Sequence, residues 1–173
     1  MVQIFRPPPA TFTDALLTLC AGKSCLKDAL PDKLLCKECS AKHESHQLEK
    51  EKARKKHHYL RCKRYAEGNL PLLNGISVYF IQSGDNGPIK IGITEDVKRR
   101  VKDISALNPN AVTLLAYCGG GKELEELLHL AFSAERIKNE WFEPSNRILE
   151  VIEIAKSDLP QNIYKEIEPY LKP

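Results

Sequence analysis

The chain contains no run of about 18 consecutive apolar residues, the length that a membrane-spanning helix requires. Its first segment, Met1–Pro9, lacks the apolar stretch of an export signal. Internal repeats and long low-complexity tracts are also missing. These absences exclude a membrane span and lead us to expect a cytoplasmic protein. A length of 173 residues allows one ordinary domain and a small additional module.

A strong excess of one charge is missing as well. The 26 lysines and arginines nearly balance 23 acidic residues, which leaves a net charge of +3. Positive charge is instead concentrated between Ala41 and Glu67, a stretch without proline or glycine. Acid–base pairs four residues apart, such as Glu51 and Lys55, stabilise helices. We therefore predict an exposed basic helix in this stretch.

This predicted helix has two interpretations, and the sequence leaves both open. It is either a solvated connector or a surface that contacts nucleic-acid phosphates. The candidate nucleic-acid-binding residues are Lys52, Arg54, Lys55, Lys56, Arg61, Lys63 and Arg64.

Four of the six cysteines lie close together near the N-terminus. They are Cys20, Cys25, Cys36 and Cys39. Two thiol pairs separated by a short spacer are typical of a structural Zn²⁺ site, and His43 or His46 can replace one cysteine. Disulfides would need an oxidising compartment, and a redox Cys-x2-Cys would need a thioredoxin-like context. Neither is indicated, so we predict a zinc-ribbon-like module.

A β-hairpin is predicted from two strings, 78–81 and 90–92, on either side of a Gly-Asp-Asn-Gly turn. The length of this loop pairs odd positions of the first strand with even positions of the second. Tyr79 then shares a face with Lys90 and Gly92, opposite the isoleucines of the second strand. A phenol and an amine thus meet over a glycine that permits close approach. We interpret this face as a small functional site.

The hairpin is followed by a predicted helix that begins after Thr94, a hydroxyl N-cap followed by two acids. Arg100 lies beside the apolar stripe of this helix. The Asn-Pro-Asn sequence at 108–110 ends the helix, and residues 112–117 read as a third strand. The apolar stripe consists of Val97, Val101 and Ile104.

A longer helix is predicted for about residues 122–138, after three glycines. Glu125 and His129 lie one turn apart on one edge of its apolar stripe, and Arg136 lies further along that edge. We expect Glu125, alone among the neighbouring acids, to face the sheet. A further amphipathic helix is predicted from Ile148 onward.

In this order, the motifs resemble those of the GIY-YIG endonuclease superfamily. The resemblance covers about residues 76–154 and is closest to a compact phage and bacterial branch that ends in Glu-Trp-Phe, here 140–142. It implies that Tyr79 is the first-motif tyrosine and Arg100 the helix arginine. Lys90 stands where many members have a second tyrosine, so this position departs from the common pattern.

The resemblance also implies the chemistry of the site. Glu125 would bind Mg²⁺ or Mn²⁺, which polarises a phosphate and activates water. Arg100 would stabilise charge on the phosphate oxygens. Tyr79 would act as base or orient water, with Lys90 lowering its pKa and His129 orienting Glu125 or moving a proton.

Each of these residues also has an ordinary structural interpretation. A tyrosine in a strand is usually a packing residue, and Arg100 follows other cations on a solvated face. Glu125 can be a surface acid and His129 a satisfied helix residue. Trp141 and Phe142 fit a core better than a substrate contact. Only the order of the motifs together favours a site.

The sequence therefore predicts an α+β protein with a small, mainly antiparallel three-stranded sheet flanked by helices. We expect an extended arm and zinc module at 1–40, a basic helical connector at 41–70, a nuclease core at 71–158 and a tail helix at 159–173. The predicted function is a metal-dependent DNA endonuclease of a phage or mobile element, in a bacterial or phage-infected cell. The alternatives are a non-catalytic DNA-binding protein of the same fold and a scaffold that binds proteins through its zinc module.

Overall fold

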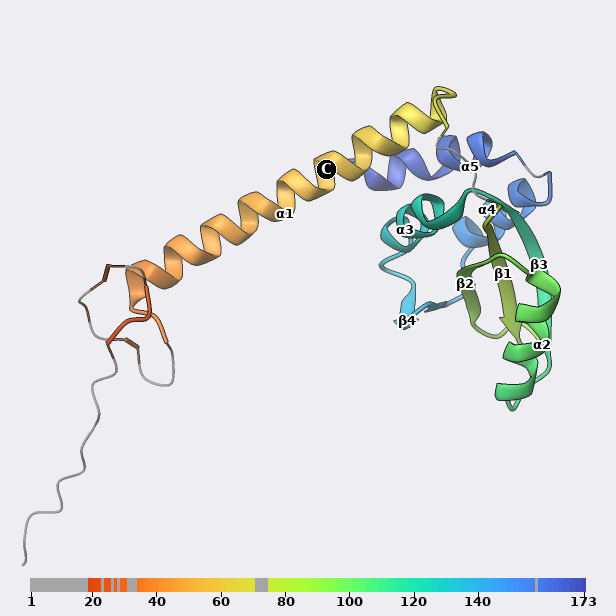
Figure 1. Ribbon diagram of the computed structural model, residues 1–173, viewed down its shortest axis with the longest axis horizontal. Coiled ribbons are helices and arrows are strands. Elements are labelled where there is room, and N and C mark those ends of the chain that lie inside the picture. Colours follow the sequence, from red (N-terminus) through yellow and green to blue (C-terminus); the bar gives the residue numbers. More distant parts are fainter. Residues whose placement is uncertain are drawn as a thin grey trace, which may run out of the picture. The chain divides into compact units, whose positions relative to one another are not determined.

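A computed structural model of the chain describes residues 19–22, 24–25, 27, 29–30, 34–70, 75–157 and 159–173. The chain divides into two compact units, one up to Lys50 and one from Glu51 onward (Figure 1). The predicted N-terminal arm lies outside the described residues. Among the described residues, no helix has the length and apolarity to cross a membrane.

The predicted basic helix is present as α1, Lys37–Ala66. Glu38 lies in its first turn and Lys63 and Arg64 in its last turn, where each charge complements the helix dipole. Its side chains are mostly exposed until the final turns. There the helix buries His58, Cys62, Tyr65 and Ala66.

The second unit contains an antiparallel sheet with strand order β3-β1-β2-β5-β4. The strands are β1 Ser77–Ser83, β2 Ile89–Thr94, β3 Val112–Gly119, β4 Arg136–Lys138 and β5 Trp141–Phe142. The α+β class is confirmed, but the sheet has five strands and not three. β4 and β5 contain only 3 and 2 residues, too few for a period-two pattern to show in the sequence.

The first of the two missed strands, β4, lies where the sequence predicted the end of a long helix, and β5 follows directly after it. That helix, α3, covers Gly121–Ala131 and does not continue to residue 138. Its apolar stripe stops at Ala131, and Arg136 belongs to β4 instead. Asn139 has a φ of 52°, which closes the tight turn between β4 and β5.

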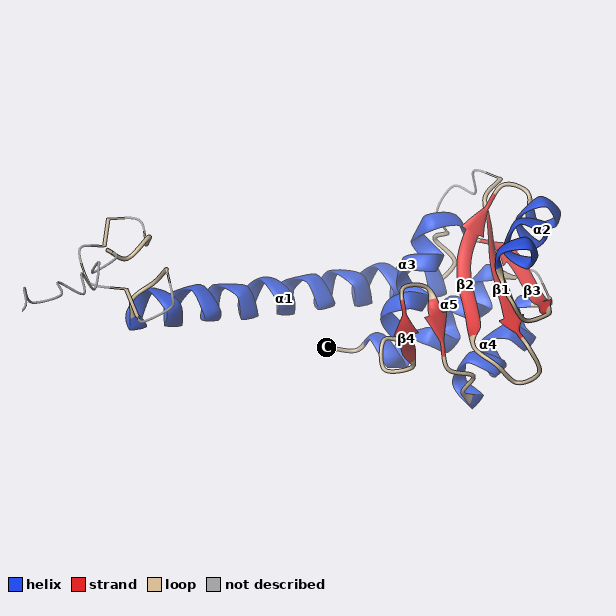
Figure 2. Ribbon diagram, turned by 90° about the horizontal axis from the view of Figure 1, so that it is seen from below, coloured by secondary structure: helices blue, strands red, loops and turns tan. Residues whose placement is uncertain are grey.

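Helices cover both faces of the sheet (Figure 2). One face, with Val78, Phe80 and Ile91, packs against α3, α4 Asn146–Ala155 and α5 Pro160–Ile167. A short 3-10 helix, η1 Glu168–Leu171, adds Leu171 to this core. The opposite face carries Tyr79 and Ile81, which pack with Ile104 of α2, Val97–Leu107.

The start of α2 differs from the prediction by two residues. Asp96 is the N-cap, and its carboxylate accepts a hydrogen bond of 3.0 Å from the Arg99 amide. The Thr94 hydroxyl instead accepts from the Asp96 amide at 3.2 Å. Both residue types are good N-caps, so only the position of the first helical turn decides between them.

The packing of α4 predicts that alanine substitutions at two adjacent residues reduce the free energy of unfolding by different amounts. Ile148 is 0% exposed and Leu149 is 42% exposed. Ile148→Ala should lower the free energy of unfolding by about 2–5 kcal/mol because it leaves a cavity. Leu149→Ala should change it by less than about 0.5 kcal/mol. Urea unfolding followed by circular dichroism measures both; equal losses would contradict the packing of this helix.

Candidate active site and metal centre

The β1–β2 register places the candidate site on the predicted face. Tyr79 pairs with Gly92, and Ile81 pairs with Lys90, so Tyr79, Gly92 and Lys90 share one face of the sheet. The Tyr79 side chain itself occupies the space above the glycine. A Cβ at Gly92 would lie 2.6 Å from the Tyr79 hydroxyl oxygen, which is closer than any real contact. Tyr79 is only 1% exposed.

Arg100 is held by this buried phenol. Its Nε donates a hydrogen bond of 3.2 Å to the Tyr79 hydroxyl oxygen. This hydrogen bond raises the pKa of Arg100, which therefore stays a cation. α2 places Arg100 beside its apolar stripe, as predicted, with the side chain half-buried. The guanidinium is thus held at Nε by this hydrogen bond, while Arg100 also lines two open grooves.

Lys90 forms an ion pair with Glu140, which lies just before β5. Its Nζ also lies 5.6 Å from the centroid of the Trp141 ring. The charge of the ammonium is therefore balanced by the Glu140 carboxylate, and the group is held near the aromatic ring. In the sequence, the Glu-Trp-Phe motif supported only the family resemblance, and no role was predicted for Glu140.

Glu140 acts electrostatically on two of the candidate site residues. Its charge acts on the pKa of Arg100 and raises the pKa of Glu125. Burial is the larger cause of the raised pKa of Glu125, which lies on α3. Within the described part of the chain, the Glu125 carboxylate makes no hydrogen bond or ion pair. A half-buried acid without a partner can take a proton or a cation.

His129 lies one turn after Glu125 but makes a different contact from the predicted one. Its Nε2 donates to the Ile91 carbonyl oxygen at 3.0 Å. Burial lowers the pKa of His129, so the ring is mainly neutral at pH 7. The histidine therefore attaches α3 to β2, and this bond uses one of its two ring nitrogens.

Two grooves open beside Arg100. A groove of about 420 Å³ is lined by Lys90, Arg100 and Trp141 among others. A second groove, about 330 Å³, lies at the start of α2 and also includes Arg100. Tyr79 lines neither groove. The structure thus brings Tyr79, Arg100 and Lys90 together. Glu140, which forms the ion pair with Lys90, also acts electrostatically on Glu125.

The four predicted cysteines form a cluster in the first unit. Their sulfur atoms lie within 4.8 Å of one another, and Cys25 and Cys36 are 3.7 Å apart. Four thiolates about 2.3 Å from one zinc ion would be about 3.8 Å apart. The cluster can therefore bind a metal ion such as zinc. His43 and His46 are exposed on α1 and do not belong to the cluster.

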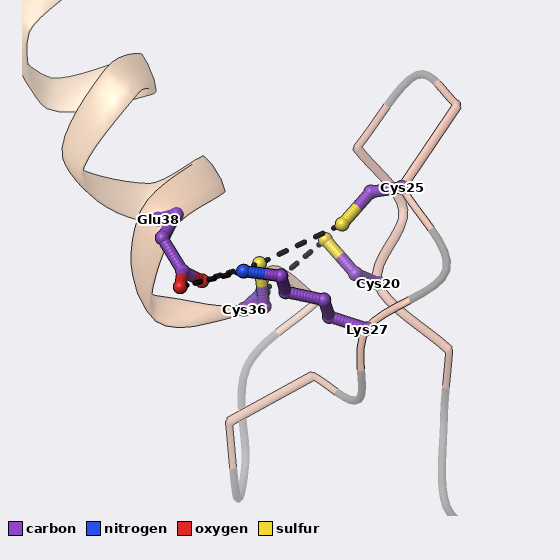
Figure 3. A network of polar contacts seen from close by, with 5 residues as sticks. All are labelled: Cys20, Cys25, Lys27, Cys36 and Glu38. Atoms are coloured by element: carbon purple, nitrogen blue, oxygen red, sulfur yellow. Dashed lines mark hydrogen bonds and ion pairs between the residues drawn. The ribbon is translucent and has the colours of Figure 1, made fainter.

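Backbone amides donate hydrogen bonds to the sulfur of Cys20, and Figure 3 shows the contact between Cys36 and Cys20. The amides of Cys36 and Gly22 donate to it at 3.2 and 3.3 Å. The Cys36 amide is the main cause that lowers the pKa of Cys20 to about 7, so the thiolate is accessible at neutral pH. A Cβ at Gly22 would lie 2.6 Å from the Cys39 sulfur, so only glycine fits there. The ion pair between Lys27 and Glu38, at 2.7 Å, lies beside the cluster.

Six of the seven candidate nucleic-acid-binding residues are exposed on α1. Arg61 is the exception: it forms an ion pair of 2.6 Å with Glu126 of α3 and is only 19% exposed. Arg54 and Lys55 both pair with Glu51. The exposed residues are Lys52, Arg54, Lys55, Lys56, Lys63 and Arg64.

Comparison with known families matches residues 76–156 to the T5orf172 domain, a phage-associated, nuclease-like domain related to GIY-YIG-type and HNH-type endonucleases. The match covers the sheet, α2, α3 and α4, and thus the whole candidate active site. It suggests a nuclease or nucleic-acid-binding role. The comparisons with curated proteins and with solved structures gave no match.

The cysteine cluster predicts which thiols determine metal content. Protein purified without chelator should contain about one zinc ion per chain, and Cys36→Ser should lose it because one of four ligands is replaced. Cys62→Ala is the control: Cys62 is buried on α1, and its thiol donates to the Tyr164 carbonyl at 3.3 Å. It should keep full zinc content by plasma mass spectrometry. Zinc missing equally from both variants, or absent from the wild type, would contradict the site.

Proposed function

We propose that the chain is a metal-dependent DNA endonuclease of the GIY-YIG type that hydrolyses phosphodiester bonds. The observation that carries this proposal is the hydrogen bond from Arg100 to the buried Tyr79 hydroxyl, at the edge of two open grooves. A guanidinium fixed at one end and accessible at the other is suited to bind phosphate oxygens.

Arg100 would stabilise the negative charge that develops on the phosphate as the bond breaks. Tyr79 would hold Arg100 in this position. The sequence resemblance implied a base for Tyr79, but an oxygen that is buried and already accepts from Arg100 has little access to water. Burial therefore favours a positioning role for this tyrosine.

Glu125 is the acid that fits a divalent cation, because its carboxylate is half-buried and has no partner among the described residues. Glu140 provides a second carboxylate nearby, although Lys90 neutralises it. Mg²⁺ or Mn²⁺ at this place would polarise the phosphate and lower the pKa of water. A raised pKa means that protons compete with the cation for Glu125 at a higher pH than for an ordinary glutamate.

The other two parts of the chain would serve DNA binding. The exposed cations of α1 would contact phosphates without reading sequence. The cysteine cluster would hold a structural Zn²⁺ that stabilises the first unit, where the described residues bury few apolar side chains.

A second function, DNA binding without cleavage, is favoured by one observation. Lys90 takes the place of the second tyrosine and is bound by Glu140, so it cannot assist Tyr79 directly. A chain with this arrangement could bind phosphate through Arg100 and act by occupying DNA.

Cleavage of supercoiled plasmid with Mg²⁺ or Mn²⁺ tests the proposal. Arg100→Ala and Glu125→Gln should each reduce the cleavage rate at least about 100-fold, because each removes stabilisation of the transition state. Lys98→Ala and Glu123→Gln are matched controls on the same helices and should cleave normally.

Two outcomes would contradict it. Undiminished cleavage by Arg100→Ala or Glu125→Gln would place the chemistry elsewhere. Wild-type protein that binds DNA but cuts none with either metal would support the non-catalytic alternative.

The role of α1 predicts a salt-dependent affinity for duplex DNA. The double variant Lys52→Gln/Lys56→Gln should reduce the slope of log K against log salt by about 2, because each phosphate that a lysine neutralises adds about 0.9 to the slope. Lys165→Gln, an exposed lysine of α5, should leave the slope unchanged. Fluorescence anisotropy at several salt concentrations measures these slopes. A slope that is the same in all three proteins would exclude α1 from DNA binding.

A further inference from the structure

The groove of about 420 Å³ beside Arg100 is lined by residues of the sheet and of α2. Lys90 and Trp141, which pair across β2 and β5, line it from the sheet. The lining from α2 and the two residues after it combines charged and apolar side chains: Arg100, Asp103, Ile104, Leu107, Asn108 and Pro109. Its volume is within the range of about 300–1,000 Å³ for small-molecule sites.

Trp141 faces this groove because of its place in the sheet. It pairs with Lys90 across β2 and β5, so both side chains lie on the face that carries Tyr79. Its neighbour Phe142 points to the opposite face and is fully buried in the core. The core position predicted for both aromatics thus holds for Phe142 but not for Trp141, which is only half-buried.

Two apolar side chains of the groove, Leu107 and Trp141, are accessible to solvent. Leu107 is 88% exposed, although Val101 and Ile104 of the same helix pack on the sheet. The Lys90 ammonium lies 5.6 Å from the centroid of the Trp141 ring, and this cation–π contact helps to hold the ring in place. A flat apolar group can bind between the Trp141 ring and the exposed Leu107 side chain, which both line the groove.

We propose that this groove is a nucleobase subsite, in which the base that flanks the phosphate bound by Arg100 stacks on Trp141. The proposal rests on the proposed function for the phosphate at Arg100. Every base has a π-face, so stacking on Trp141 would hold the strand without selecting a sequence. A base can stack in the groove only after it has separated from the neighbouring bases of its strand. Once the base is held on Trp141, the phosphate next to it is positioned against the Arg100 guanidinium.

Intrinsic fluorescence tests the subsite directly, because Trp141 is the single tryptophan of the chain. A thymidine octanucleotide, dT8, should quench its emission with a saturable curve. An abasic octanucleotide with the same sugars and phosphates should bind with little quenching. Anisotropy of dye-labelled strands measures binding in parallel. Equal quenching by both strands, no quenching at saturation, or no binding of either strand would overturn the proposal.

Affinity measurements on variants separate stacking from folding. Trp141→Ala should weaken dT8 binding about 5- to 150-fold, the factor expected for one stacked base, and leave the affinity for the abasic strand unchanged. Trp141→Phe keeps an aromatic ring and should recover most of the affinity. Tyr170→Ala, which removes an aromatic ring that stacks on Arg147 elsewhere in the unit, should have no effect. Equal loss for both strands would indicate a structural role for Trp141 and overturn the subsite.

The failure of this proposal differs from the failure of the endonuclease. Protein that cuts no DNA but shows base-dependent quenching keeps the subsite and loses the catalytic function. If cleavage requires Arg100 and Glu125, but Trp141→Ala changes neither binding nor cleavage, the catalytic function is supported and the subsite is contradicted.

Discussion

The register between β1 and β2 determines which side chains reach the grooves and which enter the core. Because a strand alternates its side chains between two faces, a shift of one residue would exchange the two sets. In the observed register, Phe80 and Ile91 enter the large core, while Tyr79 packs against α2 on the other face and Lys90 lines the larger groove. The burial of Ile89 and Ile91 on one face thereby places Tyr79 and Lys90 on the other face. Stability and the candidate chemistry depend on the same pairing.

Charges of alternating sign follow from this arrangement. Glu140 binds Lys90 and also acts on the pKa of Arg100 and Glu125, which lie on different helices. One carboxylate thus acts electrostatically on both Arg100 and Glu125. Any anion that approaches Arg100 enters the field of Glu140, so the cationic groove is weaker than two free cations would make it.

The sequence predicted the parts that local patterns control. Alternating isoleucines fixed the hairpin face, and four cysteines at ligand spacing predicted the sulfur cluster that the structure contains. β4 and β5 were missed because two or three residues carry no periodicity, and the place of β4 was assigned to a helix that in fact ends at Ala131. The contacts of Glu140 also depend on these strands, since its pairing with Lys90 joins residues 50 positions apart in the chain. Only tertiary structure can show such a contact.

The close fit between Tyr79 and Gly92 has a consequence for how this protein can diverge. A side chain at position 92 needs the volume that the phenol now fills, so enlarging one residue demands a smaller one at the other. Such a compensating exchange would preserve the sheet but delete the hydroxyl that Arg100 uses. Homologous chains should therefore retain this tyrosine–glycine couple together or abandon it together, and those that abandon it should also be free to replace the arginine.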